Sequence, residues 1–310
     1  MAWNFFKYCS GLRVVGSLMI FLVAAIIGVT YYAVVITIYG PQMFHGGSEA
    51  IVAFVIVIIF HLLLVMLIWC YFMVVLTDPG GVPPNWRPMI DEEDVEAHQM
   101  AISRTVPPGT SGSACPESLV SNMDEIQDFR YCNKCENYKP PRCHHCRVCQ
   151  RCILKMDHHC VWVVNCVGAR NYKFFLLFLI YTFLETTLDM FVLLPHFINF
   201  FKDVEHHAGS SNYLATTFLA FILNIAFALS LLGFLILHSS LVLANTTTIE
   251  VYEKKKTSPW RYDMGRRRNF EQVFGMRKLY WLIPLYAEED IASMPALQGL
   301  EFPARPDVEG

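Results

Sequence analysis

Four long apolar stretches constrain this chain more than any other feature of its sequence. They run from about Leu12 to Tyr39, Ala50 to Leu76, Tyr172 to Leu194 and Tyr213 to Leu243. Each reaches the length of about 20 residues that a helix needs to cross a bilayer. Hydrophobic residues make up 54% of the chain, above the roughly 45–50% of soluble domains. We therefore predict four transmembrane helices.

The basic residues predict which way these helices face. The loop from Gly40 to Glu49 contains no Lys or Arg, and the loop after the third stretch contains only Lys202. The chain has 24 Lys and Arg residues, and all of them except Lys202 lie at or beyond the opposite ends of the stretches. Because basic loops stay in the cytoplasm, both termini and the segment between helices 2 and 3 are expected to be cytosolic. Gly40-Pro41 and Pro195 are expected to mark helix ends on the far side.

Composition divides the chain into five segments. Residues 1–77 hold the N-terminus and helices 1 and 2, and residues 172–244 hold helices 3 and 4. Residues 78–129 begin with Asp-Pro-Gly-Gly and become acidic and rich in Ser, Pro and Gly, which predicts a loosely ordered linker. Residues 130–171 carry most cysteines, and residues 245–310 form a C-terminal tail.

The charged residues predict contact with the lipid bilayer and no binding of nucleic acid. The net charge of -3 gives no case for nucleic-acid binding. The clusters Lys254–Lys256 and Arg266–Arg268 follow helix 4 closely and favour contact with anionic lipid head groups, with a solvated charged face as the alternative. No basic stretch, apolar run and small-residue cleavage site follow one another near the N-terminus, so we expect no removable signal peptide.

Eight of the eleven cysteines lie between Cys132 and Cys166. This density is too high for a disulfide scaffold with its own core and favours metal ligation. Together with four histidines, the segment can bind two Zn²⁺ ions and leave four groups over. Since it is short and polar, metal binding must contribute its stability. Spacing alone does not divide the ligands among Cys132, Cys135, Cys143, His144, His145, Cys146, Cys149, Cys152, His158, His159, Cys160 and Cys166.

The run Asp157-His158-His159-Cys160 indicates which thiol is spared from the metal. Alternate side chains of an extended stretch face opposite ways, so His158 and Cys160 share one face and His159 takes the other. A histidine beside a thiol lowers the thiol pKa and raises its reactive thiolate fraction. Asp157 can hold the imidazole in the productive tautomer only if the chain bends locally. The pattern favours Cys160 as a nucleophile.

This run, inside this cysteine spacing and between two membrane spans, resembles the DHHC family of protein S-acyltransferases (palmitoyltransferases). Three further motifs follow in the family's order, and the similarity covers most of the chain. They are Asp78-Pro79-Gly80 after helix 2, Thr247-Thr248-Ile249-Glu250 after helix 4, and the aromatic-asparagine motif from Asn269-Phe270 through Val273-Phe274-Gly275.

The resemblance implies a fold class and a set of metal ligands. The fold would be an all-α membrane protein with four transmembrane helices and a small cytosolic two-zinc cysteine-rich domain between helices 2 and 3. One structural Zn²⁺ would be bound by Cys132, Cys135, His145 and Cys152. The other would be bound by Cys146, Cys149, His159 and Cys166. Cys143 and His144 remain unassigned.

The resemblance also implies a reaction. Cys160 would take a long-chain acyl group, mainly palmitoyl, from acyl-CoA, with His158 as base and Asp157 orienting it. The acyl group would then pass to accessible cysteines of membrane-associated proteins, in a two-step ping-pong scheme. Val161 and Val164 depart from the family's proline and asparagine, which we interpret as tuning the rigidity of the turn. The family favours the Golgi, with the plasma membrane and other endomembranes open.

Several polar residues in or near the spans are candidates for contact with the acyl donor. Glu185 and Asp189 lie four apart, hence on one helical face, and Glu185 lies about 20 Å along its helix. In the family, the position of Glu185 lies near the far end of the acyl cavity, and the position of Thr30 matches its partner. We hypothesise that these two groups limit acyl length; the alternative is that both carboxylates reach the lumenal interface. The predicted contacts are Thr30, Trp162, Glu185, Thr247 and Thr248.

Other functions for these features remain open. For His61 and His238, a bond to a neighbouring helix is expected, and Trp162 either packs on the acyl chain or anchors at the interface. A non-enzymatic adaptor with zinc fingers would leave Asp157, His158 and Cys160 without roles. A metal transporter needs several ligands within the spans, and the sequence offers little beyond one histidine and a carboxylate pair.

Overall fold

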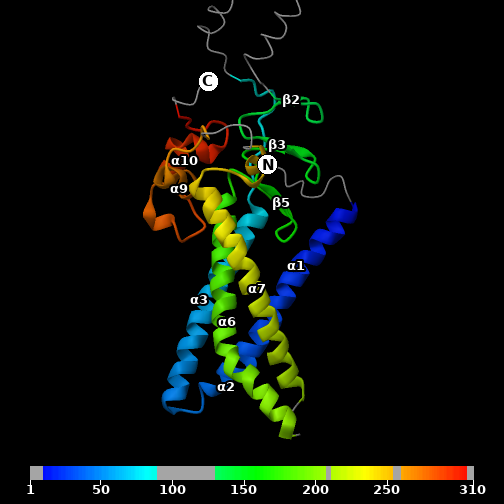
Figure 1. Cartoon of the computed structure of the whole chain (residues 1–310), viewed down its shortest axis with the longest axis vertical. Helices are drawn as coiled ribbons and strands as arrows, with labels where there is room; N and C mark the ends of the chain where they lie inside the picture. Colours follow the sequence, from blue (N-terminus) through cyan, green and yellow to red (C-terminus); the bar gives the residue numbers. More distant parts are fainter. Residues whose placement is uncertain (1–9, 89–129, 207–210, 254–259, 306–310) are drawn as a thin grey trace, which may run out of the picture.

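Four long helices form the body of the molecule (Figure 1). The computed structural model describes residues 10–88, 130–206, 211–253 and 260–305. The four helices that are long and apolar enough to cross a membrane confirm the prediction of a multi-pass membrane protein. The first consists of α1 (Ser10–Tyr31), the π-helix η1 (Tyr32–Tyr39) and α2 (Gly40–Gln42); the others are α3 (Gly47–Leu76), α6 (Tyr172–His206) and α7 (Ser211–Leu243).

Helix α6 lies at the centre of the bundle. It packs against both α3 and α7, and α1 crosses α7. Large apolar side chains remain exposed on the outer faces, among them Phe21, Ile51 and Leu229. An exposed apolar belt of this extent is stable only in a lipid environment, where the helices also satisfy their backbone groups internally.

Of the two predicted proline signals, only Gly40-Pro41 marks a helix end. The first membrane helix ends at Gln42, directly after Pro41, which lies in the first turn of α2, where a missing N–H costs little. Pro195 lies inside α6, which continues to His206, so the expected end at Leu194 is wrong. The reason is that a helix broken among apolar groups leaves backbone groups unpaired, whereas the continued helix stacks Phe197 on Phe221 of α7 at 4.1 Å between ring centroids.

The cysteine-rich segment folds into three short antiparallel hairpins above the bundle (Figure 1). Strand β1 (Tyr131–Cys132) pairs with β2 (Asn137–Tyr138), β3 (His144–Cys146) with β4 (Arg151–Ile153), and β5 (His158–Cys160) with β6 (Asn165–Val167). Strands of two or three residues bury too little apolar surface to fold alone. Their stability must come from the ligands that they carry and from the bundle below.

The start of the predicted linker is docked on these hairpins. The Leu154 N–H donates to the Gly80 carbonyl at 2.9 Å, and the Arg151 guanidinium contacts Asp78 at 2.8 Å. Loose order is therefore wrong for residues 78–88, because the turn at Gly80 adds its backbone to the domain. Residues 89–129 lie outside the described part of the chain.

The tail folds beside the hairpins (Figure 1). It contains α8 (Thr248–Glu253), α9 (Arg266–Phe274), the 3₁₀ helix η3 (Lys278–Tyr280), α10 (Glu288–Ser293) and α11 (Pro295–Gln298). Asn269 is fully buried, and its amide donates to the Leu243 carbonyl at 2.7 Å, which ties α9 to the end of α7. The cluster Arg266–Arg268 is exposed, while Lys254–Lys256 lies outside the described residues.

Candidate active site and zinc centres

The hairpins gather eight ligands into two groups of three cysteines and one histidine. Within each group the candidate ligand atoms all lie within 4.8 Å of one another. The register aids this, because His145 faces Cys152 and His159 faces Cys166 directly across their ladders. The groups are Cys132, Cys135, His145 and Cys152, and Cys146, Cys149, His159 and Cys166, the same division that the family resemblance implied.

This donor set fits zinc. The Cys135 sulfur lies 3.2 Å from His145 Nδ1, and the Cys149 sulfur lies 3.4 Å from His159 Nδ1. Such spacings suit the edges of a tetrahedron around one ion with bonds of about 2.0–2.3 Å, and three thiolates with one imidazole form a common closed, structural zinc site. When bound, zinc would clamp each hairpin without an open coordination position for catalysis.

The two groups repeat with an offset of 14 residues. In each, the second cysteine follows the first by three residues, the histidine follows ten later and the last cysteine seven after that. By the same offset, Cys143-His144-His145-Cys146 matches Asp157-His158-His159-Cys160. This internal repeat would have divided the ligands from the sequence alone, and our sequence analysis missed it. Cys143 is fully buried beside the first group, at the position equivalent to Asp157.

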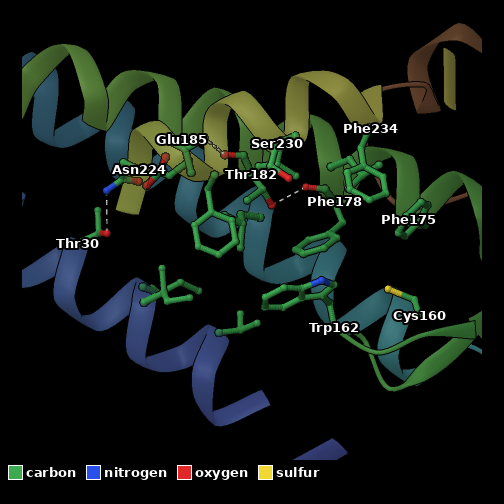
Figure 2. Close-up of a pocket in the computed structure, with 18 of the residues that line it drawn as sticks. Thr30, Cys160, Trp162, Phe175, Phe178, Thr182, Glu185, Asn224, Ser230 and Phe234 are labelled. Atoms are coloured by element: carbon green, nitrogen blue, oxygen red, sulfur yellow. Dashed lines mark hydrogen bonds between the residues drawn. The ribbon is translucent and has the colours of Figure 1, made fainter. Parts of the chain in front are cut away.

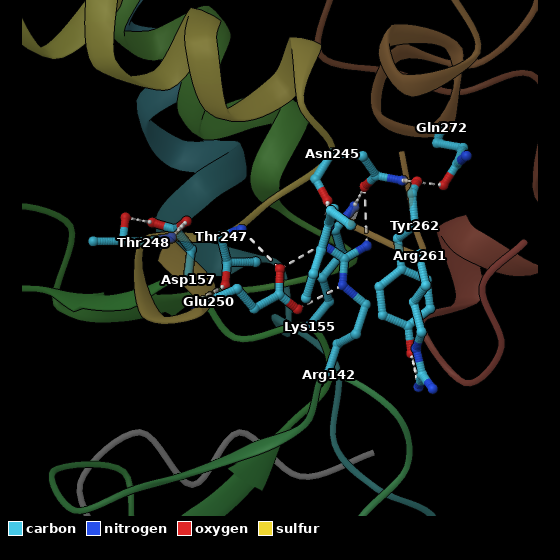
Figure 3. Close-up of polar contacts among 11 residues, drawn as sticks. Arg142, Lys155, Asp157, Asn245, Thr247, Thr248, Glu250, Arg261, Tyr262 and Gln272 are labelled. Carbon is cyan, nitrogen blue, oxygen red and sulfur yellow. Dashed lines mark hydrogen bonds and ion pairs between the residues drawn. The ribbon is translucent and has the colours of Figure 1, made fainter. Parts of the chain in front are cut away.

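Cys160 lies outside both metal groups. Strand β5 places His158 and Cys160 on one face and turns His159 to the metal group, as alternation predicts. The chain bends so that Asp157 Oδ2 lies 2.6 Å from His158 Nδ1. The Asp157 carboxylate is itself held by the Thr248 backbone N–H at 2.8 Å and hydroxyl at 2.9 Å (Figure 3).

The electrostatics of this cluster favour an ionised thiol. Burial would raise the pKa of Cys160, but the hydrogen bond and positive charge of His158 outweigh burial and lower it. Burial would likewise lower the pKa of His158, yet its bonds to Asp157 and Cys160 raise it to about 9. These shifts favour a thiolate–imidazolium pair, the reactive state of a cysteine nucleophile.

A cavity of about 350 Å³ opens at Cys160 and continues between α1, α3, α6 and α7 (Figure 2). Near the thiol its walls are apolar and aromatic, with Phe175, Phe178 and Trp162. Trp162 also packs edge-on to Phe227 of α7, with ring centroids 6.0 Å apart. The tryptophan thus lines the cavity. Its other expected role, as an interface anchor, is compatible with its 39% exposure.

The opposite end of the cavity is polar (Figure 2). Thr30 and Glu185 both reach it, as expected, but they are not bonded to each other. Instead Asn224 of α7 donates to the Thr30 hydroxyl at 3.1 Å. Asp189 is fully buried and also lines the cavity, so the carboxyl groups of Glu185 and Asp189 both lie inside the helix bundle. Asn224 is not recognisable as a cavity residue from the sequence, because nothing in its local sequence separates it from a lipid-facing or core asparagine.

Two of the predicted donor contacts have a different position. Thr247 and Thr248 are absent from the cavity wall. Thr248 bonds to Asp157, while the Thr247 N–H donates to Glu250 Oε2 at 2.9 Å and its hydroxyl accepts from the Glu250 N–H at 3.2 Å. Thr248 thus supports Asp157, and Thr247 bonds within the first turn of α8. Contact of either residue with acyl-CoA stays a prediction.

A buried ionic cluster joins the first zinc hairpins to α8 (Figure 3). Arg142 donates from Nε and Nη2 to the two carboxylate oxygens of Glu250, each at 2.7 Å, and from Nη1 to Asn245 Oδ1 at 2.9 Å. Lys155 also reaches Asn245 Oδ1, at 3.3 Å, and burial lowers its pKa to about 7. The cluster fixes α8, and with it Thr248, against the zinc domain.

The two histidines that the sequence analysis singled out in the spans, His61 and His238, are bonded to neighbouring helices, as expected. His61 of α3 lies 3.3 Å from the Tyr31 hydroxyl of α1, and His238 Nδ1 of α7 lies 3.1 Å from the Tyr172 hydroxyl at the start of α6. The His238 and His158 rings lie 6.0 Å apart. The hydrogen bonds of His61 with Tyr31 and of His238 with Tyr172 explain why polar imidazole rings are stable inside these apolar helices.

Fold and site together define an integral membrane protein with two zinc-type ligand groups and a spare thiol beside a histidine, and the comparisons with known proteins specify it further. The DHHC palmitoyltransferase family matches residues 125–255. A "probable protein S-acyltransferase 14" of Arabidopsis thaliana is 60% identical across 100% of this chain and 97% of its own length. "Palmitoyltransferase ZDHHC2" of Homo sapiens is 31% identical across 95% of this chain and 85% of its own length. The chain belongs to the DHHC palmitoyltransferase family and transfers palmitoyl groups to proteins.

Proposed function

We propose that Cys160 carries the acyl group as a thioester between acyl-CoA and a protein cysteine. The observation that carries this proposal is the position of Cys160, outside both zinc groups, beside His158 and at the mouth of an apolar cavity. In the first step the Cys160 thiolate attacks the acyl carbonyl carbon. The bond from that carbon to the CoA sulfur breaks, and the His158 imidazolium gives its proton to the departing sulfur.

The second step reverses these roles. Neutral His158 accepts the proton of a substrate thiol, whose sulfur attacks the acyl–Cys160 thioester and releases Cys160 as a thiolate. Asp157 stabilises the imidazolium that forms each time. Both steps exchange one thioester for another of similar energy, so the enzyme supplies proximity rather than driving force.

The apolar cavity would hold the acyl tail. Burying each CH₂ group contributes roughly 0.8 kcal/mol, so a sixteen-carbon tail supplies much of the donor's binding energy. We propose that Trp162 packs on the tail near the thioester, and that Glu185 and Thr30 limit its length at the far end. Replacing Glu185 with Leu should shift the preference among donors of different chain length; an unchanged profile would remove this role.

We also propose that both termini and the zinc domain face the cytosol, where acyl-CoA and the cysteines of membrane-associated proteins are found. The distribution of basic residues supports this orientation. The Golgi is the compartment that the family resemblance favours. Protease protection of a tagged chain in sealed vesicles tests the orientation, and imaging against compartment markers tests the location.

One experiment separates the acyltransferase from an adaptor or a transporter. Wild type, Cys160→Ser and Cys143→Ala are purified and their zinc contents measured, and each is incubated with labelled palmitoyl-CoA. Cys143 serves as the matched control because it is buried in the same domain and belongs to neither metal group. Hydroxylamine-sensitive label on wild type and Cys143→Ala, and none on Cys160→Ser at equal zinc content, supports the mechanism. Retained label on Cys160→Ser contradicts it.

A further inference from the structure

The far end of the acyl cavity contains hydrogen-bonding groups that have no partner. Glu185 is 5% exposed and Asp189 is fully buried. None of their four carboxyl oxygens has a hydrogen-bond partner within the described residues, and both side chains line the cavity. Buried polar groups in native proteins are nearly always paired, so these two indicate that a polar ligand atom belongs beside them.

Four other polar side chains along the cavity already form hydrogen bonds. The Thr182 hydroxyl donates to the Phe178 carbonyl at 2.7 Å, and the Thr186 hydroxyl donates to the Thr182 carbonyl at 2.9 Å. At the far end itself, Thr30 and Asn224 bond to each other. Among the described residues that line the cavity, the buried side-chain atoms without a hydrogen-bond partner belong only to Glu185 and Asp189, a carboxyl pair that we call the polar floor.

The polar floor lies where the end of a long acyl chain would reach. Glu185 follows Tyr172 by thirteen residues, which corresponds to about 20 Å along α6. Figure 2 shows Glu185 and Cys160 at opposite ends of the cavity, with Phe178 between them. The terminal methyl of an unsubstituted chain would meet the carboxyl pair without forming a bond. A hydroxyl there would donate to a carboxylate, or accept from a carboxylic acid.

We propose that this enzyme accepts long-chain acyl groups that carry a hydroxyl at their terminal carbon, and that the polar floor recognises this hydroxyl. The inference rests on the proposed function, because the chain must enter the cavity from Cys160. The transfer is the thioester exchange described above. The terminal hydroxyl takes no part in it, and no further reactant is needed.

The test compares two donors of equal size with purified full-length protein in lipid nanodiscs. 16-Hydroxyhexadecanoyl-CoA and heptadecanoyl-CoA have the same number of heavy atoms and differ only in a terminal hydroxyl against a methyl group. Hydroxylamine-sensitive acylation of Cys160 is followed by mass spectrometry, and kcat/KM is obtained for each donor. We expect wild type to favour the hydroxylated donor about tenfold, the value of one net hydrogen bond to a buried carboxyl group.

Three variants locate the effect. The double variant Glu185→Leu/Asp189→Leu should reverse the preference, while Glu185→Gln, which keeps hydrogen-bonding atoms, should retain it. Thr182→Val is the matched control: its hydroxyl is bonded to the backbone of its own helix, so its removal should leave the ratio of the two donors unchanged.

Each outcome supports or overturns the inference. A wild-type ratio below about two overturns it, whatever the variants do, and indicates that water fills the polar floor. A tenfold wild-type ratio that survives in the double variant also overturns it, because recognition then lies elsewhere. If Cys160 takes up heptadecanoyl but rejects the hydroxylated chain, this inference alone fails. If Cys160 takes up neither chain, the proposed function fails with it.

Discussion

The buried ion pair between Arg142 and Glu250 allows a quantitative prediction. The two side chains are 1% and 3% exposed, and their contact is bidentate, with both distances at 2.7 Å. Arg142 also donates to the Asn245 carbonyl at 2.8 Å, and its guanidinium lies 4.8 Å from the Tyr262 ring centroid. Replacing Arg142 with Leu removes all these contacts and leaves a carboxylate buried without its cation.

The expected cost is large. Removing one partner of a buried ion pair typically destabilises a protein by about 3–5 kcal/mol, against total stabilities of about 5–15 kcal/mol. Arg142→Leu should therefore lower the free energy of unfolding by about 3–5 kcal/mol. Because Glu250 and Thr248 share helix α8, the same change should also loosen Asp157 and reduce acylation of Cys160.

The assay is reversible denaturant unfolding of the purified protein in mixed micelles, with acylation measured in parallel. Arg267→Leu is the matched control, because Arg267 pairs with Glu271 at 2.9 Å with an 88% exposed side chain, and such surface pairs contribute about 0–1 kcal/mol. In a double-mutant cycle, adding Glu250→Leu to Arg142→Leu should recover part of the loss, since no unpaired ion remains. If the free energies of unfolding of Arg142→Leu and Arg267→Leu differ by less than about 1 kcal/mol, the Arg142–Glu250 ion pair does not stabilise the protein as proposed.

Three further predictions concern the active-site hairpin. Val164 has φ 51°, a left-handed conformation that a β-branched residue tolerates poorly, so Val164→Asn should raise the free energy of unfolding by about 1 kcal/mol; a decrease contradicts this. Because the bond to protonated His158 lowers the pKa of Cys160, the alkylation rate of Cys160 should reach its plateau at a lower pH than that of an ordinary thiol and fall as acid protonates the thiolate; the same pH profile as an ordinary thiol argues against the ion pair. Thr248→Val removes one of two bonds to Asp157 and should slow acylation about tenfold at unchanged zinc content, with an unchanged rate as the contrary result.

Much of the active site follows from local patterns in the sequence. Alternation along an extended stretch puts His158 with Cys160 and His159 with the metal, and β5 has this arrangement. The division of the eight zinc ligands was also present locally, in the 14-residue repeat, although our sequence analysis took it only from the family resemblance. The helix end expected at Pro195 is wrong, because proline is a local signal and the packing of α6 against α7 overrides it.

The membrane spans, the two groups of zinc ligands and the spare thiol can all be located from local sequence patterns. Hydropathy and ligand spacing act over a few to about twenty neighbouring residues, so they can be read without knowing the fold. The residues that surround these sites are known only from the folded chain. Thr248 supports Asp157 from 91 residues away, and Asn224 rather than Glu185 bonds Thr30 from 194 residues away. Such pairings depend on how the helices pack against one another, and no local pattern encodes that packing.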